Sequence, residues 1–372
     1  MAEPVIEVSV AQVRRYRLLR NGLFSPFASP TAAAAALCGV QAQIEPAAGL
    51  ALWNRTTGLT ESRFEAMLYE ERSLVKLWGQ RGTLHLYPSA EWPLVHSMLA
   101  ANQTWWGRTA EREERLDEYN QLVEQVAEIL RQRTVMGRRD LRGSEIKLDD
   151  EHLSPWGGVF SDLVRRGYAC HAGRMGGEGV FAAREVWLPN LDWQPPPPEA
   201  ANVAAARRFL HTFGPSTQQD FIYWRGSRGG FGRQWWAALA NDTVEVSVAG
   251  RPMWILREDL ADLLAPPDEL TGHVRMLGRF EPMLLSQKEN SWIVPPHADK
   301  QVIRPAGHIE AILLVEGQAV ATWRYARKGR GLVITVDRFP EWRARFRRPV
   351  ERVVQQVAAF FEMPLVALEG VR

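Results

Sequence analysis

The sequence is poor in cysteine and has no long apolar stretch. Its two cysteines, Cys38 and Cys170, cannot supply a four-thiolate zinc site, an iron–sulfur cluster or a disulfide framework. The longest uninterrupted apolar stretch is nine residues, 32–40, whereas a membrane-spanning helix needs about 20. Arginines interrupt the first 20 residues before any apolar core forms, unlike a secretory signal peptide. These absences predict a cytoplasmic protein of a reducing compartment with no membrane partner.

Lysine is scarce too, since only five of the 45 cationic residues are lysines. The planar guanidinium of arginine suits phosphates and guanine edges, although codon usage in a GC-rich genome gives the same enrichment. The formal net charge is +2, which neither requires nor excludes a nucleic-acid partner.

Motifs of common cofactor and metal chemistry are absent as well. The sequence has no P-loop, no Rossmann glycine pattern after a strand and no Gly-x-Ser-x-Gly elbow. Its eight histidines show no metal-ligand spacing. The acidic segment 149–151 lacks the spacing of a calcium loop and is interpreted as solvated. We therefore expect neither a metal nor a cofactor.

The length of 372 residues corresponds to two to four domains at ~100–200 residues each. One arrangement occurs three times along the chain, in which helices precede a β-hairpin. The predicted hairpins cover 74–87, 167–188 and 244–256. This order is typical of the winged-helix variant of the helix-turn-helix.

Polar residues with capping patterns predict where several helices begin. The pairs are Ser9 with Gln12, Ser29 with Pro30, and Ser216 with Gln219, and Thr60 can cap another helix.

The pattern changes after Pro266. Strands at 312–315, 319–324 and 332–336 and a helix from Pro349 predict a small sheet with a covering helix. The predicted fold class is therefore α+β, with three tandem winged-helix units and a C-terminal β-rich lobe. A proline run before Pro198 supplies one boundary. The predicted domains are 1–115, 116–193, 194–265 and 266–372.

Four short segments carry a resemblance when they are taken together. They are Gln41-x-Gln43, Trp-Gly-Gln-Arg-Gly-Thr-Leu-His at 78–85, Gly-Pro-Ser-Thr-Gln-Gln-Asp-Phe-Ile-Tyr-Trp at 214–224, and a strand at 319–324 that ends in Thr-Trp-Arg. On composition alone the two glutamines indicate only surface polarity. In this order the segments resemble the bacterial winged-helix DNA glycosylases of the AlkZ-like family, over nearly the whole chain.

The resemblance implies a C-shaped monomer that clamps double-stranded DNA and excises N7-alkylated guanine without a metal or cofactor. The family carries a catalytic Gln-x-Gln or Gln-x-Asp motif, and Gln41 and Gln43 match the first type. That type is associated with self-resistance in antibiotic-producing actinomycetes. There the lesions are bulky adducts or interstrand crosslinks of azinomycin, hedamycin-like pluramycins and trioxacarcins. Ala42 stands where a larger hydrophobic residue is usual, which we interpret as extra room for a large adduct.

The implied chemistry can proceed without carboxylates. An N7-alkylguanine is already cationic, so it leaves without the acid that ordinary glycoside hydrolysis needs. The remaining tasks are to stabilise a developing oxocarbenium ion and to position water, and amide oxygens can do both. Which glutamine orients the water stays open. A bulky adduct does not pass easily through the base stack into a snug pocket, so we expect a shallow site.

Side chains on hairpins and loops are the candidates for DNA contact. His85 has an alternative interpretation, as a hairpin residue that satisfies local hydrogen bonds. The predicted DNA-contacting residues are Arg55, Arg81, Thr83, His85, Arg327, Lys328 and Arg330.

Two other classes of protein remain open at this stage. A winged-helix transcriptional regulator would bind a palindromic site as a dimer and leave DNA covalently unchanged, but the sequence shows no ligand domain or dimerisation coiled coil. A resistance protein could also bind drug or adduct without chemistry.

Overall fold

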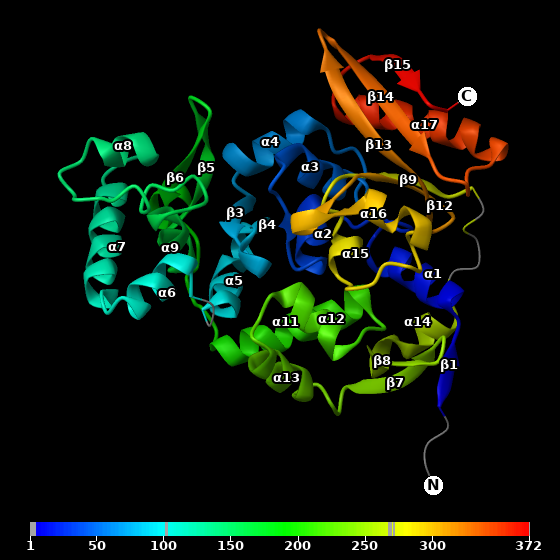
Figure 1. The fold of residues 1–372 in the computed structure, drawn as a ribbon, viewed down its shortest axis with the longest axis horizontal. Coiled ribbons are helices and arrows are strands. Elements are labelled where there is room, and N and C mark those ends of the chain that lie inside the picture. The colour runs from blue at the N-terminus through cyan, green and yellow to red at the C-terminus, as the bar shows by residue number, and fades with distance from the viewer. Residues whose placement is uncertain (1–4, 101–102, 267–269, 271, 372) are drawn as a thin grey trace. The chain divides into compact units, whose positions relative to one another are not determined.

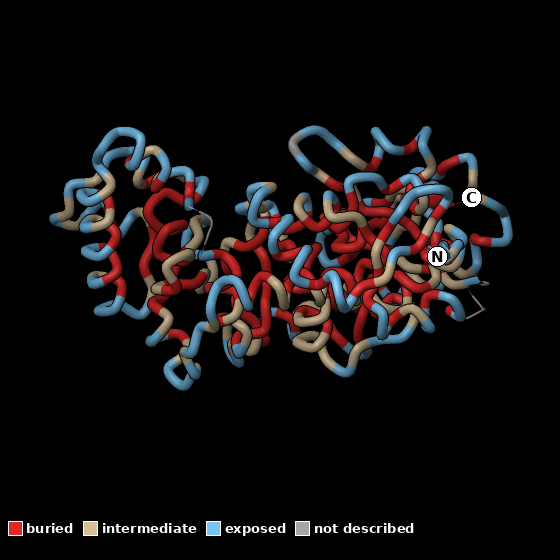
Figure 2. Tube along the Cα trace, turned by 90° about the horizontal axis from the view of Figure 1, so that it is seen from below, coloured by how far each residue is buried: buried red, intermediate tan, exposed pale blue. Residues whose placement is uncertain are grey.

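The computed structural model describes residues 5–100, 103–266, 270 and 272–371. The chain folds into two compact units (Figure 1), and buried residues run through the interior of each (Figure 2). Unit 1 combines the chain up to residue 64 with the chain from residue 203, and unit 2 is the continuous segment 65–202. The division at residue 64 falls inside the first predicted domain, 1–115, so the four-domain scheme stays a proposal.

The N-terminal part of unit 1 begins its helices where the capping residues predict. Ser9 forms a capping box with Gln12, and the Ser29 hydroxyl accepts from the backbone at the start of the next helix. An unpredicted helix follows, which is buried along most of its length and therefore has no polar face that would mark it. The elements are β1 (Ile6–Val8), α1 (Val10–Arg20), α2 (Pro30–Ala36), β2 (Val40–Gln41), α3 (Glu45–Trp53) and the start of α4 (Glu61–Tyr69).

The segment that follows unit 2 again consists of helices and a hairpin. Its elements are α11 (Pro198–Phe213), α12 (Gln218–Arg225), α13 (Gly229–Ala237), β7 (Thr243–Val248), β8 (Arg251–Leu256), η3 (Arg257–Asp259) and α14 (Leu260–Leu264). The capping box of α12 uses Thr217 and Asp220, so the predicted pair Ser216 and Gln219 was wrong by one residue. Ser216 is buried, and its hydroxyl donates to the Phe213 carbonyl instead.

The two parts of unit 1 are joined by strand pairing and by a shared core. Strand β1 pairs in parallel with β7, in the order β1-β7-β8. Val13 and Tyr16 of α1 pack in one core cluster with Val246 and Ile255 of the hairpin. Leu18 of the same helix packs in a second cluster, with the C-terminal part of the chain. Helix α1 therefore links both regions.

The predicted C-terminal sheet with a covering helix is present. Its strand order is β15-β14-β13-β12-β9, with β14 and β15 parallel and the other pairs antiparallel. Helix α17 (Arg347–Phe360) packs against β9. The strands are β9 (Val274–Leu277), β12 (Ile312–Val315), β13 (Gln318–Lys328), β14 (Gly331–Arg338) and β15 (Leu365–Glu369). Shorter elements are α15 (Pro282–Leu285), η4 (Pro296–Ala298), α16 (Asp299–Val302), β10 (Ile303–Arg304), η5 (Pro305–Gly307), β11 (His308–Ile309) and η6 (Ala344–Phe346).

Unit 2 contains the other two predicted hairpins. Its strands lie in the order β4-β3-β5-β6, and helix α9 packs on β3 and β5. The strands are β3 (Leu74–Trp78), β4 (Leu84–Pro88), β5 (Ala169–Met175) and β6 (Glu178–Ala183). The helices are η1 (Gln80–Gly82), η2 (Ser89–Glu91), α5 (Trp92–Leu99), α6 (Trp105–Arg112), α7 (Leu116–Arg131), α8 (Arg138–Arg142), α9 (Val159–Arg165) and α10 (Arg184–Trp187).

The α+β class is therefore confirmed, and each predicted hairpin follows helices in the chain. The second hairpin is shorter than predicted because β6 ends at Ala183 and α10 begins at the next residue. The description of the three regions as winged helices stays a proposal.

Candidate functional site

Gln41 and Gln43 lie on the short connector between α2 and α3. Cys38 and Gly39 both adopt positive φ angles, 53° and 98°, and turn the chain into the two-residue strand β2. Gln41 ends that strand and is only 6% exposed, whereas Gln43 is exposed. On a longer strand the two side chains would share one face, but the strand stops at Gln41 and the chain bends before α3.

Ala42 is completely buried between the two glutamines. The space that its small side chain leaves therefore lies inside the protein. The interpretation of Ala42 as extra room for a large adduct stays a prediction.

Helix α3 holds the connector rigidly because it is packed on all sides. A side chain at Gly49 would have its Cβ 3.0 Å from the Phe64 ring and 3.1 Å from the Phe360 ring, so only glycine fits without a shift. At the far end of the helix, the Asn54 amide donates to the carbonyl oxygens of Leu50 and Met276, at 3.0 and 2.9 Å. The helix is thereby fixed to strand β9 of the same unit.

Arg55 follows α3 directly and is completely buried. Its guanidinium donates to both carboxylate oxygens of Glu281, which is also buried, and to the Ala51 carbonyl oxygen at 2.9 Å. A guanidinium enclosed in this way does not reach a ligand outside the protein. We therefore remove Arg55 from the predicted DNA-contacting set, and assign it the role of anchoring α3.

The N-terminal end of α3 points toward the exposed glutamine. Its N-cap residue, Ile44, provides no side-chain hydrogen bond. Backbone N–H groups at an uncapped helix start carry partial positive charge and favour electron-rich groups nearby. Glu45 occupies the first turn and is half-buried. Two amides, one carboxylate and a helix end thus meet within five consecutive residues.

Arg81, Thr83 and His85 share one hairpin of unit 2. The turn between β3 and β4 places Arg81 at φ 55° and Gly82 at φ 70°. Below the turn, the Tyr87 hydroxyl donates to the side-chain oxygen of Gln80, which is 1% exposed. The hairpin therefore has a buried polar base, and Arg81 and Thr83 are half-buried at its tip.

His85 is a buried member of that hairpin. It is 3% exposed, and its Nδ1 lies 3.0 Å from the Thr83 carbonyl oxygen, which can only accept. Burial lowers the pKa of His85 to about 3, with a further contribution from the charge of Arg81. The imidazole is therefore neutral at physiological pH and donates locally, as our alternative interpretation of this residue holds.

Arg327, Lys328 and Arg330 lie together at the hairpin between β13 and β14, and all three are exposed. Arg327 is bound by Glu61, at 2.5 and 2.6 Å. Among the residues that the structure describes, Lys328 and Arg330 have no ion-pair partner. The tip therefore presents two uncompensated positive charges to solvent.

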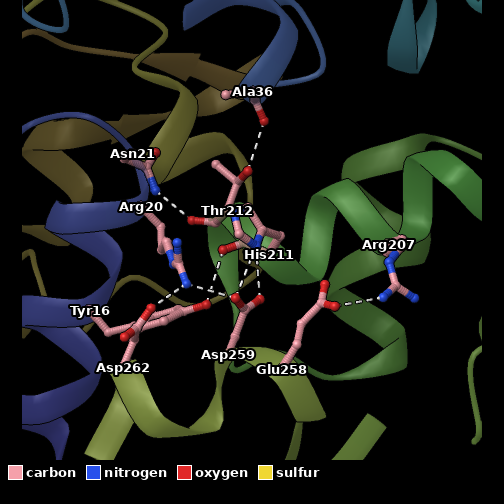
Figure 3. A network of polar contacts seen from close by, with 10 residues as sticks. All are labelled: Tyr16, Arg20, Asn21, Ala36, Arg207, His211, Thr212, Glu258, Asp259 and Asp262. Carbon is pink, nitrogen blue, oxygen red and sulfur yellow. Dashed lines mark hydrogen bonds and ion pairs between the residues drawn. The ribbon is translucent and has the colours of Figure 1, made fainter. Parts of the chain in front are cut away.

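A polar network in unit 1 contains the one group of described residues with metal-like geometry (Figure 3). The ligand atoms of His211, Glu258 and Asp259 lie within 4.8 Å of one another. However, Arg20 donates to Asp259 at 2.7 Å, and Arg207 donates to Glu258 at 3.0 Å. These guanidiniums already neutralise the carboxylates. The network holds α1 against α11 and α14, and we assign no metal to it.

The structure thus groups the predicted residues in three places. These are the α2–α3 connector, the β3–β4 hairpin and the β13–β14 hairpin. Within the described ranges, none of the helices is long and apolar enough to cross a bilayer.

Comparisons of the sequence and of the structure with known proteins all find DNA glycosylases. Residues 34–360 match a family described as DNA glycosylase AlkZ-like. An interstrand DNA cross-link repair glycosylase of Streptomyces sahachiroi is 29% identical over 371 residues, covering 95% of this chain and 96% of that protein. The solved structure of the Streptomyces sahachiroi DNA glycosylase AlkZ superposes with a TM-score of 0.82 at 26% identity. It covers 98% of this chain and 99% of that one.

Proposed function

The chain belongs to the AlkZ-like family of DNA glycosylases, and on that premise we propose that it hydrolyses the N-glycosidic bond of N7-alkylguanine in double-stranded DNA. The observation that carries the proposal is the position of Gln41 and Gln43 on a connector fixed by the buried helix α3. As a DNA glycosylase the protein is an enzyme, so the transcriptional regulator and the non-catalytic binding protein are not proposed.

In the proposed reaction, the cationic base departs as a neutral base with the bonding electron pair, and an oxocarbenium ion develops at the sugar. Water then adds to C1′ and releases a proton to the solvent, which leaves an abasic site. Gln43 is exposed and is the residue that a nucleotide reaches first. Its carbonyl oxygen can stabilise positive charge near C1′, and the Gln41 amide behind it can help to orient water. Fixed dipoles of this kind need no reorganisation during the reaction, because α3 already holds them in place.

We propose that the DNA backbone is held by Arg81 and Thr83 on one hairpin and by Lys328 and Arg330 on another. Lys328 and Arg330 are exposed cations at a loop tip, and Arg81 and Thr83 are a half-buried cation and a hydroxyl at another. Side chains of both kinds are typical phosphate contacts, which fix position without reading sequence. We expect Arg327 to contribute less to phosphate binding, because it already forms an ion pair with Glu61. His85 is neutral and supports the first hairpin from inside.

The proposed substrates are bulky natural-product adducts of guanine, including interstrand crosslinks, and the proposed role is self-resistance to a genotoxic compound. The name of the relative in Streptomyces sahachiroi supports the crosslink assignment. The exposure of Gln43 supports a shallow site that a large adduct can approach from outside. We further propose that the enzyme acts as a monomer.

The experiment uses purified protein and a labelled duplex with a single N7-methylguanine or a single pluramycin-type adduct. After incubation, alkali opens abasic sites, and a denaturing gel resolves the products. A cleaved band that disappears in Gln41→Ala and Gln43→Ala supports the proposal, and the ratio between the two lesions identifies the preferred substrate. Intact strands on both lesions, with DNA binding retained, would refute it.

A further inference from the structure

Unit 1 contains a cavity whose lining includes neither Gln41 nor Gln43. Its volume is about 510 Å³, within the range of small-molecule sites. It lies among the end of α3, the loop that follows, the start of β9 and the second half of α17. Its polar lining consists of Asn54, Thr56, Thr57, Thr60, Arg275 and Gln356.

Arg275 is the one charged side chain in that lining. It is half-buried. Among the residues that the structure describes, its guanidinium makes one hydrogen bond, from Nη1 to the Val274 carbonyl oxygen at 3.0 Å, and no ion pair. Its Nε is buried and has no hydrogen-bond partner in the described chain.

The neighbouring charges do not compensate Arg275. Arg55 is close enough to act on it electrostatically, but Glu281 is already bound by Arg55. Burial lowers the pKa of Arg275 from its ordinary value, and the positive charge of Arg55 lowers it further. The buried carboxylate of Glu281 therefore compensates Arg55 and leaves Arg275 without an ion-pair partner among the described residues. A partly buried cation without a counter-ion is costly, which points to an anion that arrives from outside.

A second buried atom in the lining also lacks a partner. Asn54 is 6% exposed, and its Oδ1 has no hydrogen-bond donor among the described residues, while its amide nitrogen is fully used. The Thr56 hydroxyl already donates to the Leu52 carbonyl oxygen at 2.9 Å and can still accept, and the Thr60 hydroxyl accepts from the Arg63 N–H at 3.2 Å. An anion that carries a hydroxyl group or a bound water can serve both Arg275 and Asn54. Hydrogen phosphate carries such a hydroxyl, whereas a backbone phosphodiester would reach Asn54 through a bound water, and guanidinium binds either one in a bidentate manner.

We propose that the cavity lined by Arg275, Asn54 and the three threonines is a phosphate-binding site, distinct from the Gln41 and Gln43 connector. The phosphate can come from the DNA backbone or from a free phosphate group. DNA as the source rests on the proposed function, whereas phosphate binding itself does not. Both tests measure binding and not base excision. They therefore show whether phosphate binds even if the proposed glycosylase activity is absent.

The test variant is Arg275→Gln, and the matched control is Arg279→Gln. Arg279 belongs to the segment just after β9, but Glu310 already neutralises it at 3.0 Å. Both substitutions remove one positive charge. Removal of an uncompensated cation should raise the melting temperature of Arg275→Gln in phosphate-free buffer, so this variant is expected to fold.

The first measurement is fluorescence anisotropy with an undamaged duplex at several salt concentrations. Loss of one phosphate contact should reduce the slope of log K against log salt by about 0.9. We expect this reduction in Arg275→Gln and an unchanged slope in Arg279→Gln. The second measurement is the thermal shift caused by inorganic phosphate relative to chloride at equal ionic strength. We expect phosphate to stabilise the wild type and the control, but not Arg275→Gln.

The two measurements distinguish a phosphate of the DNA backbone from a free phosphate group. A change in salt slope identifies the DNA backbone, and a lost phosphate shift with an unchanged slope identifies a free phosphate group. The proposal is overturned if neither changes in Arg275→Gln, or if Arg279→Gln changes both equally. Arg275 would then be a structural cation whose guanidinium is held by the Val274 carbonyl oxygen.

Discussion

Arg55 and Glu281 form an ion pair in the interior of unit 1, 226 residues apart in the sequence, and both side chains are completely buried. The pair fixes the end of α3 opposite to the Gln41 and Gln43 connector. An arginine that the sequence predicts as a DNA contact is thus buried, and it supports the proposed catalytic motif through the helix between them.

Removal of either partner should destabilise unit 1 strongly, because the other charge is left buried and unpaired. We expect Arg55→Met or Glu281→Leu to cost about 3–5 kcal/mol in the free energy of unfolding. The double variant should recover a large part of this loss, since it leaves no unpaired charge. Urea denaturation followed by tryptophan fluorescence measures all three. Single variants within 1 kcal/mol of the wild type, as roughly expected for a surface pair, would contradict the prediction.

Substitution of the two glutamines should affect catalysis and spare binding. Loss of one fixed dipole costs ~100-fold or more in rate in comparable sites, so Gln41→Ala and Gln43→Ala should each lower the single-turnover excision rate by about that factor. Affinity for undamaged duplex should change little, because neither amide carries charge. Gln355→Ala removes an exposed glutamine of α17 and serves as the control. Equal losses of affinity and rate would show that the motif acts mainly in binding.

Substitution of Glu45 tests whether the two amides alone suffice for catalysis or a carboxylate takes part. Glu45 is the acidic residue in the first turn of α3, two positions after Gln43. If the amides suffice, Glu45→Gln should retain excision within a few-fold. The rate should then stay flat between about pH 6 and 8, since amides do not titrate there. A large loss in Glu45→Gln, with DNA binding retained, would make Glu45 the general base.

Unit 2 should lose stability in mild acid because of His85. The pKa of His85 is about 3 in the folded protein and about 6.5 in an unfolded chain. Between these values the unfolded state binds a proton that the folded state does not, so stability falls as pH falls below 6.5. The slope from this residue is at most about 1.4 kcal/mol per pH unit. His85→Gln should flatten the acid limb of a melting-temperature profile. An unchanged limb would assign the slope to the other histidines of unit 2 whose pKa values are lowered by burial, which are His96, His152 and His171.

The β13–β14 hairpin offers a test of phosphate contact with an internal control. Lys328→Gln and Arg330→Gln should each reduce the salt dependence of DNA binding by about one unit of slope. Arg327→Gln should have a smaller effect, because Glu61 already compensates that charge. Anisotropy titrations on undamaged duplex give the three slopes. Three equal reductions would indicate a general loss of surface charge.

Local signals in the sequence predicted most of the fold. Alternating apolar residues around glycine turns located the hairpins, and Ser9 and Ser29 marked helix starts, because these features act within a few residues. Helix α3 escaped prediction since its faces are all buried and show no periodic contrast. The roles of Arg55 and Arg275 escaped as well. The ion-pair partner of Arg55 is Glu281, and the charge that acts on Arg275 is Arg55. Both relationships join residues more than 200 positions apart in the sequence.

The order of the two units along the chain has a consequence for synthesis. Unit 2 is continuous, so all of its residues leave the ribosome before the second part of unit 1 does. Strand β1 and helix α3, which follows the glutamine motif directly, are made first but must wait for β7 and Glu281. Domains generally fold in the order of their synthesis. The enzyme should therefore acquire an ordered active site only near the end of translation, and a nascent chain should remain harmless to DNA until it is nearly complete.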